Sequence, residues 1–250
     1  LCQACRHGRG GCVGAVSLPL IMVPGMMCDA RLFAPQIAAI APHRPVHVAA
    51  LSGADRIAAL AHAILDIAPP RFALAGLSMG GIVAMEVVAQ APDRVAGLAL
   101  LDTNHLAETE AVTARRVPQM ERVKAGELAA VMREELKPTY LADGQERRDI
   151  LELCADMAQQ LGPDVFLSQS RALMTRADQS MTLAAYPGPA LVLCGSHDRL
   201  CPPARHVAMQ ALMPHARLAI IDGAGHLPCL EQPDITTGHL LAWLKETENG

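Results

Sequence analysis

Short apolar runs alternate along the chain with segments whose apolar residues recur at helical spacing. The runs lack the polar alternation of strands that have one face in water, so each predicts a strand buried on both faces. Strands of this kind, followed by helices, predict an α/β fold with a mostly parallel central sheet and helices on both faces. The predicted strands cover residues 18–23, 46–51, 72–77, 95–101, 190–194 and 218–221. The predicted core helices cover residues 31–41, 55–68, 80–91, 204–212 and 235–245.

Residues 104–185 break this rhythm, because they are charged, show helical patterns and contain no good strand. We predict that they form an all-helical lid, inserted into an α/β core made of residues 18–103 and 186–250. The alternative is that residues 104–185 form additional helices of the core rather than a lid. Residues 1–17 are rich in Gly and Arg and are expected to form a flexible leader. The best helical pattern of the insertion places one apolar stripe at Ile150, Leu153, Cys154, Met157 and Leu161.

The composition of the 250-residue chain is that of a globular protein, with 51% apolar and 18% charged residues. A net charge of −4 and an aromatic content of 2% argue against a nucleic-acid partner, which requires a basic surface and rings for stacking. No apolar run reaches the ~18 residues that a membrane helix needs, so no membrane partner is expected. The sequence does not determine the oligomeric state.

Eight cysteines raise the question of metal or disulfide sites. Cys2, Cys5 and Cys12 lie in the leader beside His7, without the second ligand pair that a zinc ribbon needs, so no metal site is expected. The other five are scattered, as reduced thiols are, which favours a cytoplasmic location. The apolar run over residues 12–23 follows two arginines as in a signal peptide, but its end is better explained as the first core strand.

The sharpest local motif is Gly76-Leu77-Ser78-Met79-Gly80, which follows a predicted strand and precedes a predicted helix. In that context G-x-S-x-G forms a tight turn that lifts the serine above the end of the sheet. Flanking glycines keep side chains out of the crowded turn, and a helix N-terminus favours developing negative charge. We therefore predict that Ser78 is a catalytic nucleophile.

A serine hydroxyl needs a base, and in hydrolases with this turn an acid and then a histidine follow on loops after later strands. Asp198 follows the fifth predicted strand, and His226 lies in a glycine-rich loop after the sixth. These positions predict a catalytic triad of Ser78, His226 and Asp198. The alternatives are Asp102 at the end of the fourth strand as the acid, His197 as the base, and Asp222 as a residue that orients the histidine loop.

Acyl transfer also needs N–H donors that stabilise the oxyanion. The amide of Met79, directly after the serine, is one candidate. The amide of Met26, in the loop after the first strand, is the other, with Met27 as its alternative. Pro24 and Gly25 permit a sharp turn that would aim this amide inward, although an ordinary turn at a strand end explains them too.

Taken together, these motifs resemble the α/β-hydrolase superfamily, in particular the compact group of bacterial esterases, enol-lactonase-like and MenH-like enzymes. The resemblance extends from about residue 18 to about residue 245. It implies the hydrolase fold, a serine nucleophile and no cofactor. The chain departs from the family pattern in the Pro-Gly that replaces the common His-Gly of the oxyanion loop. Its leader is also too short for the usual two antiparallel strands, so the sheet is expected to be trimmed at one edge. The motifs that carry the resemblance are Pro24-Gly25, Cys28-Asp29-Ala30-Arg31, Gly-Leu-Ser-Met-Gly-Gly at 76–81, Leu-Leu-Asp-Thr at 100–103, Gly-Ser-His-Asp at 195–198 and Gly-Ala-Gly-His-Leu-Pro at 223–228.

These residues predict a carboxylesterase-like serine hydrolase that cleaves small-molecule carboxylic esters of short or medium acyl chain through an acyl-enzyme, without a metal. Methionine side chains adapt to different ligands, so Met27, Met120 and Met157 are predicted to line the substrate pocket with Met26 and Met79. Packing inside the lid is the alternative role for most of them. A lactone is the alternative substrate. A non-catalytic ligand-binding protein on the same fold is the alternative of another class.

Overall fold

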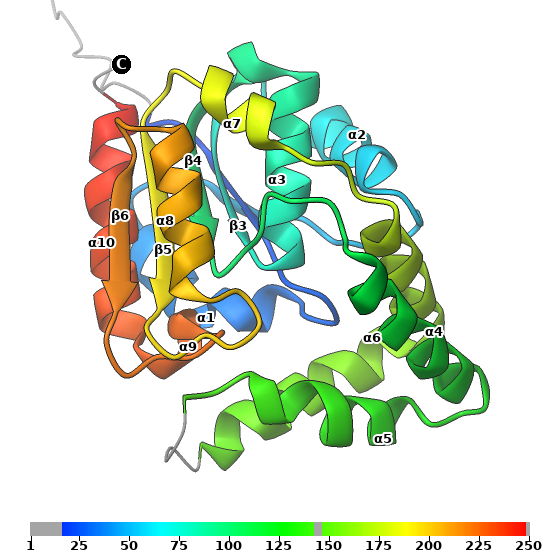
Figure 1. Cartoon of the computed structure of the whole chain (residues 1–250). Helices are drawn as coiled ribbons and strands as arrows, with labels where there is room; N and C mark the ends of the chain where they lie inside the picture. Colours follow the sequence, from blue (N-terminus) through cyan, green and yellow to red (C-terminus); the bar gives the residue numbers. More distant parts are fainter. Residues whose placement is uncertain (1–16, 143–146, 249–250) are drawn as a thin grey trace, which may run out of the picture.

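The computed structural model describes residues 17–142 and 147–248, which fold around a six-stranded sheet (Figure 1). All neighbouring strands are parallel, in the order β2-β1-β3-β4-β5-β6. The predicted α/β fold and parallel sheet are therefore confirmed. The predicted leader lies outside the described residues, apart from Ser17. The strands are β1 (Leu20–Val23), β2 (Val46–Val48), β3 (Phe72–Leu77), β4 (Val95–Leu101), β5 (Ala190–Gly195) and β6 (Arg217–Ile221).

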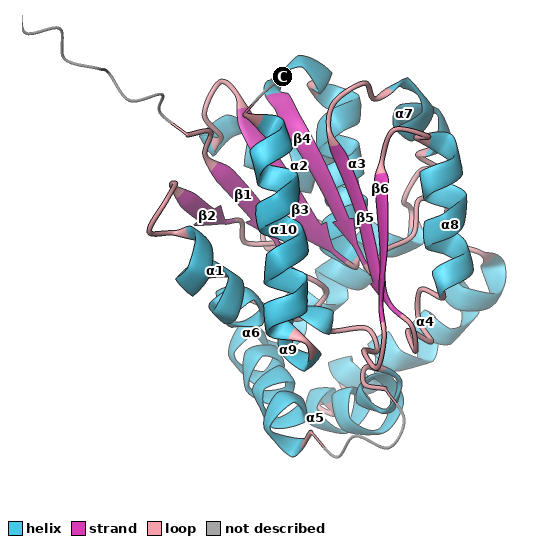
Figure 2. Cartoon of the chain, turned by 90° about the vertical axis from the view of Figure 1, so that its left-hand side faces the viewer, coloured by secondary structure: helices cyan, strands magenta, loops and turns pink. Residues whose placement is uncertain are grey.

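Alternate residues of the strands pack into two apolar cores, because successive side chains of a strand point to opposite faces. Ile21 and Val23 of β1 belong to the first core, whereas Leu20 and Met22 belong to the second. Figure 2 shows α10 lying across the second face of the sheet. The first core is covered by α2 (Ile57–Ile67), α3 (Met79–Gln90), α7 (Ser180–Ala185) and α8 (Pro203–Leu212). The second is covered by α1 (Ala34–Ile40), α9 (Pro228–Glu231) and α10 (Pro233–Thr247).

The described part of residues 104–185 forms helices and turns, and it contains no strand. Of these helices, α4 (Glu110–Lys124), α5 (Leu128–Val131) and α6 (Arg148–Met174) lie together beyond one end of the sheet (Figure 1). They share a third apolar core, which receives Met27 from the loop after β1. Within the described part of the chain, no helix combines the length and the apolar character that crossing a membrane requires.

The long helix α6 is bent at Gly162, which has a φ of 81° and is followed by Pro163. A proline cannot donate the backbone hydrogen bond of a helix interior, and glycine readily adopts a positive φ. The half before the bend contributes Cys154 and Met157 to the second core, and the half after it contributes Leu173 to the first. The two halves of α6 therefore pack against opposite faces of the sheet.

A buried histidine of α8 holds the chain where it leaves β4. The Nε2 atom of His206 accepts a hydrogen bond from the backbone N–H of Thr103 at 3.0 Å, and its side chain is fully buried. An acceptor nitrogen requires the neutral imidazole, whose other nitrogen can donate to the Pro202 carbonyl at 3.4 Å. Burial lowers the pKa of His206 from 6.5 to about 4.

We predict that His206 makes the fold sensitive to acid. A histidine whose pKa is lowered by folding stabilises the protein fully above pH 6.5, and this contribution is lost as the pH falls toward 4 because only the unfolded chain is then protonated. The loss between about pH 7 and pH 4.5 should be about 2–3 kcal/mol. Urea unfolding at the two pH values measures it. His206→Gln should reduce the pH dependence by that amount, and an unchanged dependence would contradict the assignment.

Candidate active site

Ser78 lies in the turn between β3 and α3, where the backbone is held in an unusual conformation. Its φ is 55° and its ψ is −119°, a region that a residue with a side chain rarely adopts. The turn fits only because its flanking residues are glycines. A Cβ on Gly76 would lie 2.3 Å from the carbonyl oxygen of Gly80, and a Cβ on Gly80 would lie 1.9 Å from that of Val23. These distances are a physical reason for the G-x-S-x-G pattern in this chain.

The three residues of the predicted triad form one chain of hydrogen bonds. The Nε2 atom of His226 lies 2.9 Å from Ser78 Oγ, and its Nδ1 atom lies 2.9 Å from Asp198 Oδ2. The other carboxylate oxygen of Asp198 accepts hydrogen bonds from the backbone N–H groups of Leu200 at 2.8 Å and Cys201 at 2.9 Å. This arrangement can transfer the serine proton to an imidazole whose tautomer and orientation are fixed by the acid.

The electrostatics of Asp198 suit that role. Burial disfavours its charged form, but the charge and hydrogen bond of His226 and the two backbone N–H donors outweigh burial and hold the pKa of Asp198 below its usual range. The carboxylate therefore keeps its charge at neutral pH beside the imidazole. Among the described residues, one group of potential metal ligands exists, formed by Asp198, Cys201 and His226. The atoms of Asp198 and His226 in that group are already hydrogen-bonded to each other and to Ser78.

The hydrogen-bond partner of the imidazole is Asp198 and not Asp102, the alternative acid. Asp102 has a φ of 44° and is fully buried, and its Oδ1 accepts a hydrogen bond from the Gly195 N–H at 2.9 Å. Its Oδ2 has no hydrogen-bond partner within residues 17–142 and 147–248. Burial and the nearby charge of Asp198 raise the pKa of Asp102 well above its usual value. A carboxyl group that resists ionisation is a poor partner for an imidazolium.

His197 and Asp222 lie at the surface, where both contact the hydroxyl of Ser196. His197 is exposed, and its Nδ1 lies 2.9 Å from this hydroxyl. Asp222 is exposed as well and accepts a hydrogen bond from the same hydroxyl at 3.4 Å. Ser196 also accepts a hydrogen bond from the Gly223 N–H at 3.1 Å, so these residues link the two loops outside the triad.

A buried glutamate that sequence reasoning missed anchors the loop of His226. The carboxylate of Glu231 accepts hydrogen bonds from the N–H groups of Gly225 and Leu227 on either side of the histidine, each at 3.0 Å. It also accepts one from Ala142 at 2.9 Å. In the sequence, Glu231 is recognisable only by its position, five residues after His226.

Two further residues, Tyr140 and Thr103, fix the backbone of the site, and no role was predicted for either from the sequence. The N–H of His226 donates to the Tyr140 carbonyl at 2.7 Å, which ties the histidine loop to the helical segment. The hydroxyl of Thr103 donates to the carbonyl of Ser78 at 2.7 Å. Thr103 belongs to the Leu-Leu-Asp-Thr motif, but the motif does not show these contacts, because both residues act on the backbone of residues that are distant along the chain.

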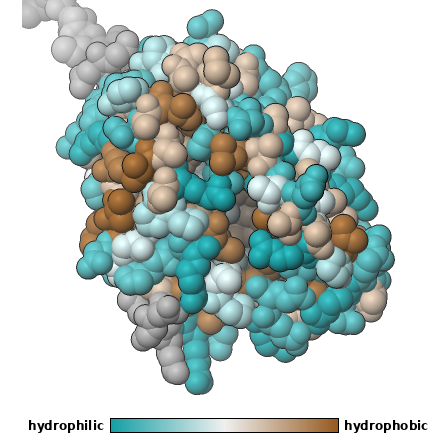
Figure 3. All heavy atoms as spheres, viewed as in Figure 1, coloured by the Kyte–Doolittle hydropathy of each residue, from teal (hydrophilic) through white to brown (hydrophobic). Residues whose placement is uncertain are grey.

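A cavity of about 220 Å³ opens above Ser78 and His226. Met26 and Met79, the predicted oxyanion donors, both line it. The amide of Met27 is not available for that role, because it donates to Oε1 of the buried Gln169 at 2.9 Å. Figure 3 shows a hollow near the middle of this face, bordered by hydrophilic and hydrophobic residues.

The structure does not bring the other predicted methionines to this cavity. Met27, Met120 and Met157 are not among the described residues that line it. Met27 and Met120 are buried in the third core, and Met157 in the second, where its sulfur accepts a hydrogen bond from the Asp29 N–H at 3.4 Å. For these three, packing of the helical segment is the role that the structure supports. Sequence reasoning also missed four arginines that line the cavity: Arg115, Arg116, Arg176 and Arg205.

We predict that Glu231→Gln loosens the histidine loop. A glutamine offers one acceptor oxygen and turns its NH₂ group toward buried N–H donors, so at least one donor loses its partner. The free energy of unfolding should fall by about 2–3 kcal/mol. Denaturant unfolding measures this change, with Glu246→Gln as the control because the side chain of Glu246 is exposed and pairs with the exposed Arg217. Equal stabilities of the two variants would contradict the anchoring role.

Comparison with known proteins shows the family of the chain and the solved structures that share its fold. The model of the "Alpha/beta hydrolase family" matches residues 7–237. The chain is 29% identical over 230 residues to the pimeloyl-[acyl-carrier protein] methyl ester esterase of Xanthomonas axonopodis pv. citri, covering 86% of this chain and 90% of that protein. Among solved structures, it is similar to a thermophilic esterase from Thermogutta terrifontis, with a TM-score of 0.82, 27% identity and coverage of 92% and 90% of the two chains. It shares its fold with the enol-lactonase from Burkholderia xenovorans, with a TM-score of 0.81, 23% identity and 92% coverage of both chains.

Proposed function

The chain belongs to the alpha/beta hydrolase family, and we propose that within it the protein is a serine hydrolase that cleaves carboxylic esters through an acyl-enzyme. One observation carries the proposal: Ser78, His226 and Asp198 form a continuous chain of hydrogen bonds, and Ser78 and His226 line a cavity. The similarity to enzymes named as esterases supports the class of reaction. The intact triad argues against a non-catalytic ligand-binding protein on this fold.

In the proposed reaction, His226 accepts the proton of Ser78 as the serine oxygen attacks the ester carbonyl. The C–O bond to the alcohol then breaks, and the imidazolium returns the proton to the leaving oxygen. Asp198 holds the imidazole in the tautomer with its proton on Nδ1 and stabilises the transient imidazolium. A water molecule, activated by His226 in the same way, hydrolyses the acyl-enzyme and restores Ser78.

We propose that the backbone amides of Met26 and Met79 stabilise the oxyanion. Both residues line the cavity, and Met79 is the first residue of α3, so its N–H belongs to the positive end of that helix. The engagement of the Met27 amide by Gln169 leaves Met26 as the candidate from the loop after β1. Since these are backbone groups, substitution of the two side chains should affect the shape of the cavity more than the oxyanion site.

We further propose that residues 104–185 serve as a lid on the core of residues 18–103 and 186–250. Residues of this segment, including Val112, Leu136, Tyr140 and Leu173, line the cavity together with Ser78.

The cavity volume of about 220 Å³ suits esters of short or medium acyl chain. A lactone of similar size is the alternative substrate, favoured by the fold shared with an enol-lactonase. The five described cysteines form no disulfide with one another, which supports the proposed cytoplasmic location.

We predict that Ser78→Ala removes ester hydrolysis. The variant lacks the attacking oxygen, so turnover of p-nitrophenyl acetate and butyrate should fall by roughly 10⁴–10⁶-fold, as after removal of a triad member in other serine hydrolases. An unchanged circular dichroism spectrum would show that the fold is retained. Turnover above about a tenth of the wild-type value would refute the assignment of Ser78 as the nucleophile.

The roles of the two aspartates can be separated by isosteric substitution. Asp198→Asn should lower turnover on the order of 10³–10⁴-fold, because the amide favours the wrong imidazole tautomer. Asp102→Asn should have little effect on turnover, because its Oδ1 can still accept the hydrogen bond from Gly195 and a neutral side chain suits its buried position. Steady-state kinetics of the same two esters measures both effects. Similar losses, or the reverse order, would assign the acid to Asp102.

A further inference from the structure

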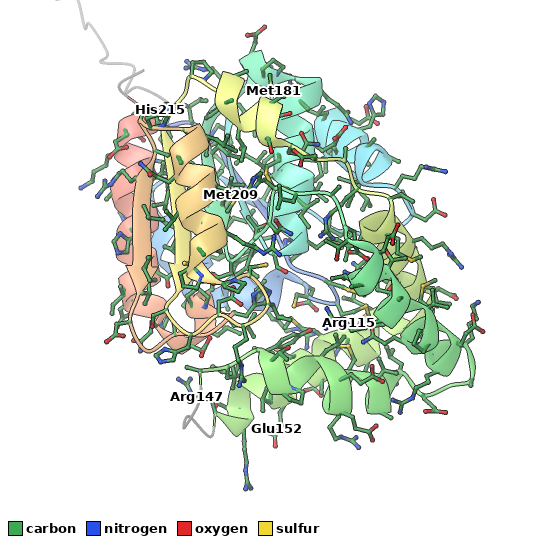
Figure 4. All side chains as sticks on the ribbon, viewed as in Figure 1. Arg115, Arg147, Glu152, Met181, Met209 and His215 are labelled. Atoms are coloured by element: carbon green, nitrogen blue, oxygen red, sulfur yellow. The ribbon has the colours of Figure 1, made fainter. Side chains whose placement is uncertain are left out.

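The cavity above Ser78 has an unusual balance of charge for a protein with a net charge of −4. Its charged lining residues are Arg115, Arg116, Arg176 and Arg205, and no aspartate or glutamate is among the described residues that line it. Arg115 projects from α4 near the space between α4 and α5 (Figure 4). An ester with no charge would gain nothing from four cations, so their presence calls for an explanation.

A buried glutamate holds two of these arginines in place. Glu108 has no exposed side-chain surface, and its carboxylate forms salt bridges with Arg116 at 2.6 Å and with Arg176. The side chains of Arg116 and Arg176 are only 16% and 8% exposed. One carboxylate cannot neutralise two guanidinium groups, so this cluster carries an excess positive charge. Burial lowers the pKa of Arg176, and so does the positive charge of Arg116, whereas the negative charge of Glu108 raises it; the net shift is downward.

The position of Arg116 connects the cluster to the reacting groups. Its Nη1 lies 3.9 Å from the sulfur of Met26, a weak acceptor that leaves most of the hydrogen-bonding capacity of this nitrogen unused. Met26 is the residue whose amide is proposed to bind the oxyanion. A guanidinium near this residue, held rigidly by Glu108, is well placed to bind a second group of the substrate.

We propose that Arg116 and Arg176 form a carboxylate subsite, so that the substrate is a monoester of a dicarboxylic acid or a lactone that carries a free carboxylate. The inference rests on the proposed esterase function and narrows its substrate class. An arginine held by a second partner loses little side-chain entropy on binding, and the planar guanidinium matches a carboxylate. Arg115 and Arg205, which line the same cavity, add to the attraction. A purely structural role, in which Glu108 only ties α4 to the chain after α6, predicts no dependence on substrate charge.

The test compares the kcat/KM of monomethyl glutarate with that of dimethyl glutarate, which has the same acyl chain without the charge. The wild-type protein should prefer the anionic monoester by at least about tenfold at low salt, and the preference should shrink at high salt. Arg116→Gln should lower this ratio by about ten- to a hundredfold, and Arg116→Lys should retain part of it. Arg115→Gln, at an exposed position that carries little risk for folding, should lower it by a smaller factor.

The matched control is Arg122→Gln, which should leave the ratio unchanged. Arg122 lies on the same helix, but it pairs with Glu127, Glu134 and Glu135 and is not among the described residues that line the cavity. Equal kcat/KM values of the two esters in the wild-type protein would overturn the subsite, and so would a ratio that Arg116→Gln and Arg115→Gln leave unchanged. A proportional loss on both esters would assign Arg116 to structure alone.

Failure of the subsite can be distinguished from failure of the esterase proposal. Hydrolysis of neither ester would count against the esterase function, while calorimetric titration of glutarate into the Ser78→Ala protein tests the subsite without turnover. The subsite is supported if the affinity for glutarate falls as the salt concentration rises and if binding disappears in the Ser78→Ala, Arg116→Gln double variant. Absence of binding to the single variant would overturn it.

Discussion

The close contact between the turn at Ser78 and the end of β1 determines the geometry of the site. Gly80 packs so near the carbonyl of Val23 that no side chain could be placed between them, and Gly76 is similarly close to the carbonyl of Gly80. This contact fixes the start of α3 against the loop that carries Met26. Because β1 and β3 are neighbours in a parallel sheet, the serine and the two proposed oxyanion donors meet at one edge. The rest of the triad lies on loops that leave the same edge from β5 and β6.

Much of the core and the hydrogen-bonded triad could be predicted from the sequence, because both rest on local patterns. Buried parallel strands are continuous apolar runs, and the elbow needs its glycines within five consecutive residues. Asp198 and His226 follow strands whose order the fold dictates, so their proximity to Ser78 could be inferred from the sequence. The acid remained ambiguous, because Asp102 also ends a strand at this edge. Only the structure shows that Oδ1 of Asp102 accepts a hydrogen bond from the Gly195 N–H and that Asp102 is fully buried.

The residues that could not be predicted act across long sequence separations. The methionines Met120 and Met157 have the right composition for a flexible pocket, but whether a thioether faces ligand or core depends on the orientation of its helix. Glu108 and Arg176 are separated along the chain by most of the helical segment, and their local sequences do not predict a salt bridge between them. The same holds for Gln169, which joins the amide of Met27 to the carbonyl of Leu51. Such contacts join segments that are far apart along the chain, and they follow from tertiary packing alone.

The bend of α6 has a consequence for how the protein folds. Its two halves contribute to the cores on opposite faces of the sheet, and the half after the bend also carries Phe166 of the third core. Removal of α6 would therefore uncover apolar surface on both faces of the sheet at once. A segment connected in this way cannot detach as an autonomous subdomain without a cost to the whole chain. We expect the sheet and the helical segment to unfold in a single cooperative transition, so that any opening of the cavity must arise from small adjustments within an intact native state.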